Sequence, residues 1–224
     1  MATPLPTNRA PFSLTDVLGC TGGRVHGPLA DEAMQIDGLS TDTRALVPGQ
    51  AFVALSGERF DGHDHLATAA ACGAALAIVE RDVPAPTGLT LLRVESTVAA
   101  LAALAHHHLT TWRDRTGGAV LALTGSAGKT TTKWAIASLL ETIAPRQVFA
   151  TPGNLNNQIG VPLSVLCLGP EHRYAVLELG TNCPGEIAAL GRIVKPDVAL
   201  LTLVAMAHTE GLGDIDAVAE EKGS

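Results

Sequence analysis

The 224-residue sequence contains only four cysteines (Cys20, Cys72, Cys167, Cys183), and none forms a Cys-x-x-Cys pair. This spacing argues against a disulfide framework and indicates reduced thiols in a cytoplasmic protein. Basic residues are also few: 15 Lys and Arg stand against 22 Asp and Glu, a formal net charge of −7. Such a chain does not favour nucleic acid as a partner. An anionic ligand must therefore be bound by local charges, a helix N-terminus or a metal ion.

Long hydrophobic runs are missing as well. No stretch approaches 18 uninterrupted apolar residues, and the opening MATPLPTNRAPFSLTDVLG lacks the apolar core of a signal peptide. We therefore expect no membrane partner and a cytoplasmic location. The composition, 46% hydrophobic and 17% charged, is typical of globular proteins. The length suits one large domain or two ordinary ones.

The pattern of apolar runs changes near residue 95. Before it, strands are predicted at 50–55, 74–80 and 89–94, with helices at 13–19 and 63–73. An alanine-rich helix, 96–112, comes next, with Ser96 or Thr97 as its cap. We predict a small α/β domain over residues 1–94 and a second domain over residues 95–224.

In the second domain, strands and helices alternate regularly. The predicted strands are 119–124, 147–151, 174–179 and 197–204, and the predicted helices are 129–144, 157–168, 185–194 and 214–222. Nearly continuous apolar strands favour a mostly parallel sheet covered by helices on both faces. The fold class is thus α/β throughout, with the second sheet of the P-loop type and incomplete. Ligands of such sheets bind beyond the carboxyl ends of the strands, so the loops there are the candidates for function.

The first of these loops is TGSAGKTT, residues 124–131. Its glycines allow successive N–H groups to face a phosphate, and the following helix adds the positive end of its dipole. Lys129 suits the terminal phosphates of a nucleotide, and the Thr130 hydroxyl suits Mg²⁺. A full Walker A motif has glycine where this chain has Leu123, so an ordinary glycine turn is the alternative.

The next loops carry polar residues whose role the pattern leaves open. In TPGNLNNQIG (151–160), the asparagines suit ligand contacts or turn and capping chemistry equally. Glu178 ends an apolar strand, where a carboxylate is costly unless paired or bound to metal, and the alternative is an exposed glutamate at a frayed strand end. His208 suits a metal ligand or a structural contact. Lys222 lies on an acidic helix, where an exposed lysine in an ion pair is the ordinary expectation.

Four segments together resemble a known family: TGSAGKTT, GNLNNQIGVPLSVL, ELGTNCPGEI, and AHTEGLG with the later KG. They are similar to the ATP-dependent Mur ligases of peptidoglycan synthesis. Within that family they resemble the branch that joins D-alanyl-D-alanine to UDP-N-acetylmuramoyl tripeptide. Other branches usually carry a Ser-Ser motif at the position of ELGTN. The segment STDTRALVPGQAFVALSGERFDGHDH is similar to that branch's UDP-substrate-binding domain, so the resemblance covers about residues 12–223.

The resemblance implies that the tripeptide carboxylate attacks the γ-phosphate of ATP and that the D-alanyl-D-alanine amine then attacks the acyl phosphate. The implied phosphate-binding residues are Gly125, Ser126, Ala127, Gly128, Lys129, Thr130 and Thr131. The implied ligands of two Mg²⁺ ions are Thr130, Glu178, His208 and Lys222, the last as a carbamate. The implied substrate-binding residues are Thr41, Asp42, Thr43 and Arg44 for the uridine diphosphate, and Asn154 and Asn157 near the reacting carboxylate. Lys129, Asn154, His208 and Lys222 are the implied catalytic residues.

In the family, the chain continues past Lys222 with a Glu, the rest of the central domain and a third domain. We therefore expect a truncated monomeric form that binds the UDP substrate without turnover. Three alternatives stay open: a non-catalytic module that binds a UDP-muramoyl peptide, a Mur-type ligase for another amino acid, and a P-loop NTPase that acts as a switch. The loop ELGTNCPGEI argues against the switch, which has no need of it.

Overall fold

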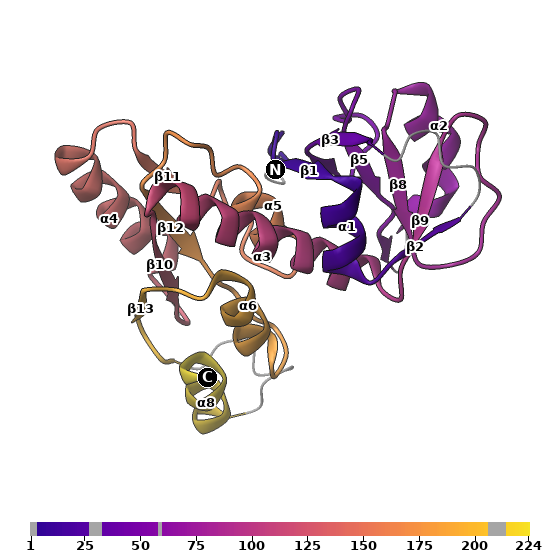
Figure 1. Ribbon diagram of the computed structural model, residues 1–224. Coiled ribbons are helices and arrows are strands. Elements are labelled where there is room, and N and C mark those ends of the chain that lie inside the picture. The colour runs from indigo at the N-terminus through magenta and orange to yellow at the C-terminus, as the bar shows by residue number, and fades with distance from the viewer. Residues whose placement is uncertain (1–3, 27–32, 58–59, 206–213) are drawn as a thin grey trace. The chain divides into compact units, whose positions relative to one another are not determined.

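The computed structural model in Figure 1 describes residues 4–26, 33–57, 60–205 and 214–224. The chain divides into two compact units, Leu5–His108 and Leu109–Ser224. This boundary lies inside one long helix, α3 (Thr97–Thr116), whereas the sequence pattern places a division before the helix, at residue 95. Each unit has its own sheet.

The first unit is built on a five-stranded sheet. Its strands, in spatial order, are β2 (Arg24–His26), β9 (Thr90–Arg93), β8 (Leu76–Val79), β5 (Ala51–Val53) and β4 (Leu39–Ser40). The last four run parallel, and β2 pairs with β9 antiparallel at one edge. Since parallel strands end at the same edge of a sheet, the segments after β4, β5 and β8 leave the sheet at that edge.

Short elements complete the first unit. They are β1 (Pro11–Ser13) paired with β3 (Gln35–Asp37), β6 (Ser56–Gly57) paired with β7 (Phe60–Asp61), α1 (Leu14–Thr21), the 3-10 helix η1 (Gly62–His65) and α2 (Leu66–Ala71). Helix α1 begins in a capping box: Ser13 Oγ accepts from Asp16 N, and Asp16 Oδ2 accepts from Ser13 N. The sequence pattern does not show β1, β2, β3, β4, β6 or β7, because two or three residues are too few for a periodic signal.

The core of the first unit lies against its central strands. All residues of β5 and β8 are buried, as expected for parallel strands covered on both faces. The cluster on one side of them consists of Leu46, Phe52, Ala54, Leu66, Ala69, Ala74, Ala77, Val79, Leu89 and Leu91. Helix α2 therefore owes its place to Leu66 and Ala69, which it buries against this sheet.

The second unit is built on a four-stranded parallel sheet. Its strands, in spatial order, are β11 (Val148–Ala150), β12 (Tyr174–Glu178), β10 (Ala119–Thr124) and β13 (Val198–Leu201). The helices are α4 (Lys129–Ile143), α5 (Gly160–Val165), α6 (Glu186–Val194) and α8 (Ile215–Gly223). This alternation agrees with the predicted one, although α5 is shorter than the predicted helix 157–168.

Helices cover both faces of this sheet. Helix α4 connects β10 to β11 in one direction across the sheet, whereas α5 and α6 connect their strands in the opposite direction. Because such crossovers are right-handed, α4 lies on one face and α5 and α6 on the other, as Figure 1 shows. Leu123, Val176 and Ala137 form the core under α4. The predicted fold class is confirmed.

Strand β13 departs from the prediction. Its apolar sequence predicts a strand covered on both faces, but all four of its residues are exposed, and so is Leu203 beyond it. Strand β13 forms the edge of the sheet, pairs only with β10 within the described residues, and has both of its faces uncovered by that part of the chain. Among the helices that the structure describes, none combines the length and apolarity needed to cross a membrane.

Candidate functional site

The loop after β10 is held by its glycine and by the chain that follows β13. Gly125 has φ of +149°, and a Cβ there would lie 2.0 Å from Thr202 Oγ1, so both backbone conformation and space require glycine. Ser126 N donates to Leu203 O (2.7 Å), and Ser126 Oγ donates to Ala205 O (2.8 Å). The loop therefore has a defined shape that depends on the neighbouring strand.

This loop leads directly into the N-terminus of α4. Gly128 is the N-cap residue, with φ of +80°, and no side chain caps the helix. The first N–H groups of a helix have no partner within it, and residues 127–128 and 130–131 are exposed. Lys129 Nζ donates to Gly125 O (2.7 Å). The start of α4 thus combines N–H donors, the positive end of a helix dipole and an ammonium group.

Glu178, the last residue of β12, is the centre of the polar contacts beside this loop. Its side chain is 2% exposed. Oε2 accepts a hydrogen bond from Thr130 Oγ1 (3.0 Å) and lies 3.3 Å from Lys133 Nζ. Oε1 accepts from Asn156 Nδ2 (2.9 Å). These partners offset the cost of burying a carboxylate, and they show that Glu178 points toward the start of α4.

Lys133 is the unexpected member of this group. Its side chain is 0% exposed, although lysine is rarely fully buried unless paired. Besides pairing with Glu178, Nζ donates to Gly153 O (2.9 Å) and lies 5.1 Å from the ring centroid of Trp134. Lys133 thus links Glu178 on β12 with the loop after β11.

The loop after β11 supplies further contacts. The buried Thr151 Oγ1 accepts from Glu178 N (3.0 Å), so the loop is tied to the end of β12. Asn157 Oδ1 accepts from Ile159 N (3.1 Å) and Gly160 N (2.8 Å), which caps the start of α5, the role that the capping interpretation predicts. Asn154 is exposed in the same loop.

The loop after β12 folds back on itself around Glu186. Glu186 Oε2 accepts from Asn182 N (2.6 Å), Cys183 N (3.1 Å) and Thr181 Oγ1 (3.2 Å), and Oε1 accepts from Gln158 Nε2 (3.1 Å). Burial raises the pKa of Glu186, but these hydrogen bonds together outweigh it and hold the pKa below its usual value. The loop after β12 is therefore a compact turn around the ionised carboxylate of Glu186.

Helix α8 packs on the start of α6 through Glu221. Glu221 is buried, and its Oε1 accepts from Ile187 N (2.8 Å) and lies 3.2 Å from Thr181 Oγ1. Its Oε2 accepts from Gly185 N. Helix α6 has no side-chain cap of its own, so a carboxylate from α8 fills that place and meets the positive end of its dipole.

Lys222 follows Glu221 and is buried, 4% exposed, which excludes the exposed ion pair as its role. Burial lowers the pKa of Lys222, the nearby Lys129 lowers it further, and Glu221 opposes the shift. The tertiary structure thus brings Lys222 within electrostatic range of the loop after β10. The other predicted metal ligand of this region, His208, lies outside the described residues.

The oxygen atoms of Thr130 and Glu178 fit Mg²⁺. A hydroxyl and a carboxylate, 3.0 Å apart, are hard oxygen ligands of the kind that Mg²⁺ prefers. Across the described ranges no group of three or more His, Cys, Asp or Glu side chains gathers to hold a metal ion. One or two protein ligands beside a phosphate-binding loop are typical of Mg²⁺ sites in which substrate phosphates and water complete the shell.

A second candidate region follows β4 in the first unit and contains Thr41, Asp42, Thr43 and Arg44. Arg44 is 88% exposed at its side chain, and its guanidinium donates to Asp42 from Nε (2.9 Å) and from the terminal nitrogen (2.6 Å). These hydrogen bonds from Arg44 hold the pKa of Asp42 below its usual value, despite partial burial. Arg44 thus offers an exposed planar cation on a fixed turn, a form suited to phosphate.

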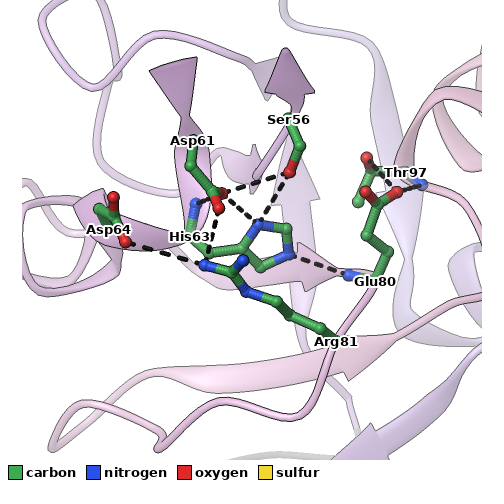
Figure 2. A network of polar contacts seen from close by, with 7 residues as sticks. All are labelled: Ser56, Asp61, His63, Asp64, Glu80, Arg81 and Thr97. Carbon is green, nitrogen blue, oxygen red and sulfur yellow. Dashed lines mark hydrogen bonds and ion pairs between the residues drawn. The ribbon is translucent and has the colours of Figure 1, made fainter. Parts of the chain in front are cut away.

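A polar network lies at the same edge of this sheet, beyond β5 and β8 (Figure 2). His63 is fully buried, with Nδ1 2.7 Å from Asp61 Oδ1 and 3.3 Å from Ser56 Oγ. Nε2 accepts from Glu80 N (3.1 Å), so the ring proton lies on Nδ1 and goes to Asp61. A catalytic triad needs Ser and Asp on opposite ring nitrogens. Here both lie at Nδ1, and the network is structural.

Two family models match the chain. The "Mur ligase family, catalytic domain" model matches residues 35–109, and the "Mur ligase middle domain" model matches residues 123–224. Together they account for both units, including the loop after β10, Glu178 and Lys222. The chain belongs to the Mur ligase family, which confirms the resemblance seen in the sequence.

Several relatives of the chain are named after one reaction. The UDP-N-acetylmuramoyl-tripeptide–D-alanyl-D-alanine ligase of Escherichia coli (strain K12) is 43% identical over 211 residues, or 94% of this chain and 43% of that protein. Crystal structure I of MurF from Acinetobacter baumannii has a TM-score of 0.84 at 39% identity, over 95% of this chain and 45% of that one. The MurF ligase from Thermotoga maritima in complex with ADP has a TM-score of 0.73 at 39% identity, over 82% and 41%. The chain spans less than half the length of these relatives.

Three residues of the site escaped the sequence analysis: Lys133, Asn156 and Glu221. Lys133 follows Lys129 by one helical turn, so both lie on one face of α4, and that spacing was the available signal. Asn156 is one of three similar asparagines, and nothing local distinguishes it. Glu221 lies in an acidic segment where exposed carboxylates are ordinary.

Proposed function

We propose that the chain provides the ATP-binding and UDP-substrate-binding parts of a cytoplasmic ligase that joins D-alanyl-D-alanine to UDP-N-acetylmuramoyl tripeptide. The observation that carries the proposal is the contact of Thr130 with Glu178 beside the loop after β10. The names of the relatives supply the reaction. In this proposal, residues 1–94 form the UDP-substrate domain and residues 95–224 form the ATP-binding domain.

In this proposal the loop Gly125–Gly128 and the start of α4 bind the β- and γ-phosphates of ATP. Exposed N–H groups supply hydrogen bonds, and Lys129 exchanges its contact with Gly125 O for a phosphate oxygen. Thr130 and Glu178 hold one Mg²⁺. The ion, when bound, neutralises charge on the phosphates and orients them for transfer.

The first chemical step brings together two anions, the tripeptide carboxylate and the γ-phosphate. A carboxylate oxygen attacks phosphorus, the bond to the β-phosphate oxygen breaks, and ADP leaves with that electron pair. The D-alanyl-D-alanine amine then attacks the acyl carbon, the bond from that carbon to the phosphate oxygen breaks, and inorganic phosphate leaves with the electron pair while the nitrogen loses a proton to solvent. Lys129 offsets the repulsion of the first step, and Asn154 and Asn157 orient the carboxylate without adding charge.

Lys222 serves in this proposal as a carbamate, with His208, at a second Mg²⁺. An ordinary lysine is about one part in 10³ neutral at pH 7, and only the neutral amine adds CO₂. Burial and the nearby Lys129 lower the pKa of Lys222 and so increase that neutral fraction. An ammonium would repel the metal ion, whereas the carbamate is an anionic ligand. Carbon-13 NMR with labelled bicarbonate would show the adduct, and Lys222→Met would remove it.

Thr41–Arg44 bind the diphosphate of the UDP substrate in this proposal. Arg44 supplies an exposed cation in an otherwise acidic protein. Because its side chain is largely exposed, Arg44→Ala should remove ligand binding with little change in the stability of the free protein.

Thermal shift separates the proposal from its rivals. UDP-N-acetylmuramoyl tripeptide and ATP–Mg²⁺ should each raise the melting temperature of the wild-type chain. Lys129→Ala should remove the ATP–Mg²⁺ shift and keep the UDP shift, and Arg44→Ala should do the reverse. A shift with nucleotide alone would instead favour a P-loop NTPase, and a shift with the UDP compound alone a binding module.

A further inference from the structure

The buried ion pair between Lys133 and Glu178 has a consequence for metal binding. We propose that Lys133 is a positioning residue that acts as a substitute cation for Glu178, so that Mg²⁺ binds this site only together with a nucleotide. The inference rests on the proposed function, since it concerns the carboxylate proposed as a Mg²⁺ ligand. It assigns a role to a residue that the proposed reaction leaves without one.

Glu178 has little capacity left for a further ligand. The carboxylate is buried and has three partners: Thr130 and Lys133 at Oε2, and Asn156 at Oε1. A carboxylate offers about four lone-pair positions, so about one is left for a further ligand. Glu178 is thus already neutralised and held in place before any metal ion binds.

Lys133 lies beneath the surface of this site. Its ammonium has no exposed surface and donates to Gly153 O, so it is not placed to contact phosphate directly. Its effect on a ligand must pass through Glu178. In this respect Lys133 differs from Lys129, one turn earlier, which is only half-buried at the exposed start of the helix.

An incoming cation meets positive charge at this site. A Mg²⁺ ion at Thr130 and Glu178 shares one carboxylate with Lys133 and lies at the loop that also carries Lys129. ATP brings its phosphate charges to this place. The ion and the nucleotide should therefore bind together, and the ion alone weakly.

The test is a titration of the full chain with Mg²⁺ alone, in which binding is measured by thermal shift and by calorimetry. Lys133→Met keeps the length of the side chain and removes the charge. Wild type should respond little to Mg²⁺ without nucleotide. In Lys133→Met, the Kd for Mg²⁺ alone should fall about tenfold or more, because an ammonium close to a divalent ion repels it strongly even at an effective dielectric constant of about 20.

Controls separate this role from a purely structural one. Lys133→Met should melt lower than wild type, since it leaves a buried carboxylate unpaired, and Mg²⁺ should restore part of the loss. Lys133→Met with Glu178→Gln should regain stability and lose the Mg²⁺ response. Lys195→Met, at an exposed lysine, should behave as wild type. All samples are matched in ionic strength with NaCl.

Two outcomes overturn the inference. In the first, Lys133→Met binds Mg²⁺ alone no more tightly than wild type does. In the second, the tighter binding of Mg²⁺ that Lys133→Met gains persists in the double variant. If Lys133→Met alone does not fold, the Mg²⁺ titration is carried out on wild type, Glu178→Gln and the double variant. Tight binding of Mg²⁺ to wild type without nucleotide then refutes the inference. Failure of ATP–Mg²⁺ to bind wild type would count against the proposed function instead.

Discussion

The contact of Glu221 with the start of α6 makes a prediction about local stability. Replacing Glu221 by alanine removes the acceptor for Gly185 N and Ile187 N and a polar contact of Thr181 Oγ1. Two backbone N–H groups at the start of α6 then lose their partner, and α8 loses a polar link to the rest of the unit. Val218 remains as a buried apolar contact of α8.

The size of the effect follows from these bonds. A hydrogen bond to a charged group contributes about 1.5–3 kcal/mol, and loss of an N-cap costs about 1 kcal/mol. The burial of the carboxylate in the native state offsets part of that sum. We expect about 2–4 kcal/mol less free energy for the opening of α8, which corresponds to about 30- to 700-fold faster exchange of its amides.

Hydrogen exchange of α8 measures this directly. Glu221→Ala should speed the exchange of amides in Val218–Lys222, up to the unprotected rate, while β10 and β12 change little. Thr181→Val, which removes one donor only, should have a smaller effect of about 1 kcal/mol. Unchanged exchange in α8 of Glu221→Ala would show that the carboxylate does not hold the helix. An equal loss of amide protection across the whole unit would show that α8 does not open independently of the rest of the unit.

Three further predictions concern other parts of the chain. Gly125→Ala should lower the free energy of unfolding by about 2–6 kcal/mol in urea denaturation, because backbone strain and the contact with Thr202 each cost about 1–3 kcal/mol; a loss under 1 kcal/mol would contradict it. Burial raises the pKa of Cys167 to about 12, so iodoacetamide at pH 8 should label the exposed Cys183 first and Cys167 last, as peptide mass spectrometry would show. The pKa of Asp61 is lowered to about 2, chiefly by a backbone N–H, so its contribution to stability is present above about pH 4 and is lost as the pH falls toward 2. Asp61→Asn should therefore flatten the decline of stability between pH 4 and 2 in urea titrations, and an unchanged slope would refute this.

Much of the second unit could be predicted because its signals are local. Strand β10 has the predicted bounds, and α4 begins at Lys129 as expected, since the apolar run and the glycines mark both. The first unit was predicted less completely. Its edge strands β2 and β4 have two or three residues, and their pairing depends on partners far along the chain.

The exposure of β13 and the burial of Lys133 both show that residue type alone does not predict burial. An apolar strand indicates burial, but β13 lies at the edge of the sheet with both of its faces exposed. A lysine indicates exposure, but a carboxylate on the adjacent strand allows full burial of Lys133. In both cases the neighbour decides the outcome, and the neighbour is not adjacent in sequence.

The sequence by itself determined the α/β alternation, the glycine loop before α4 and the membership of a ligase family, because these depend on residues a few positions apart. Only the tertiary structure decided that β12 lies next to β10. That strand order brings Glu178 to Thr130, Lys133 and Asn156, and the packing of α8 on α6 brings Lys222 toward Lys129. Such contacts depend on how distant segments share a buried core, and no local pattern encodes that choice.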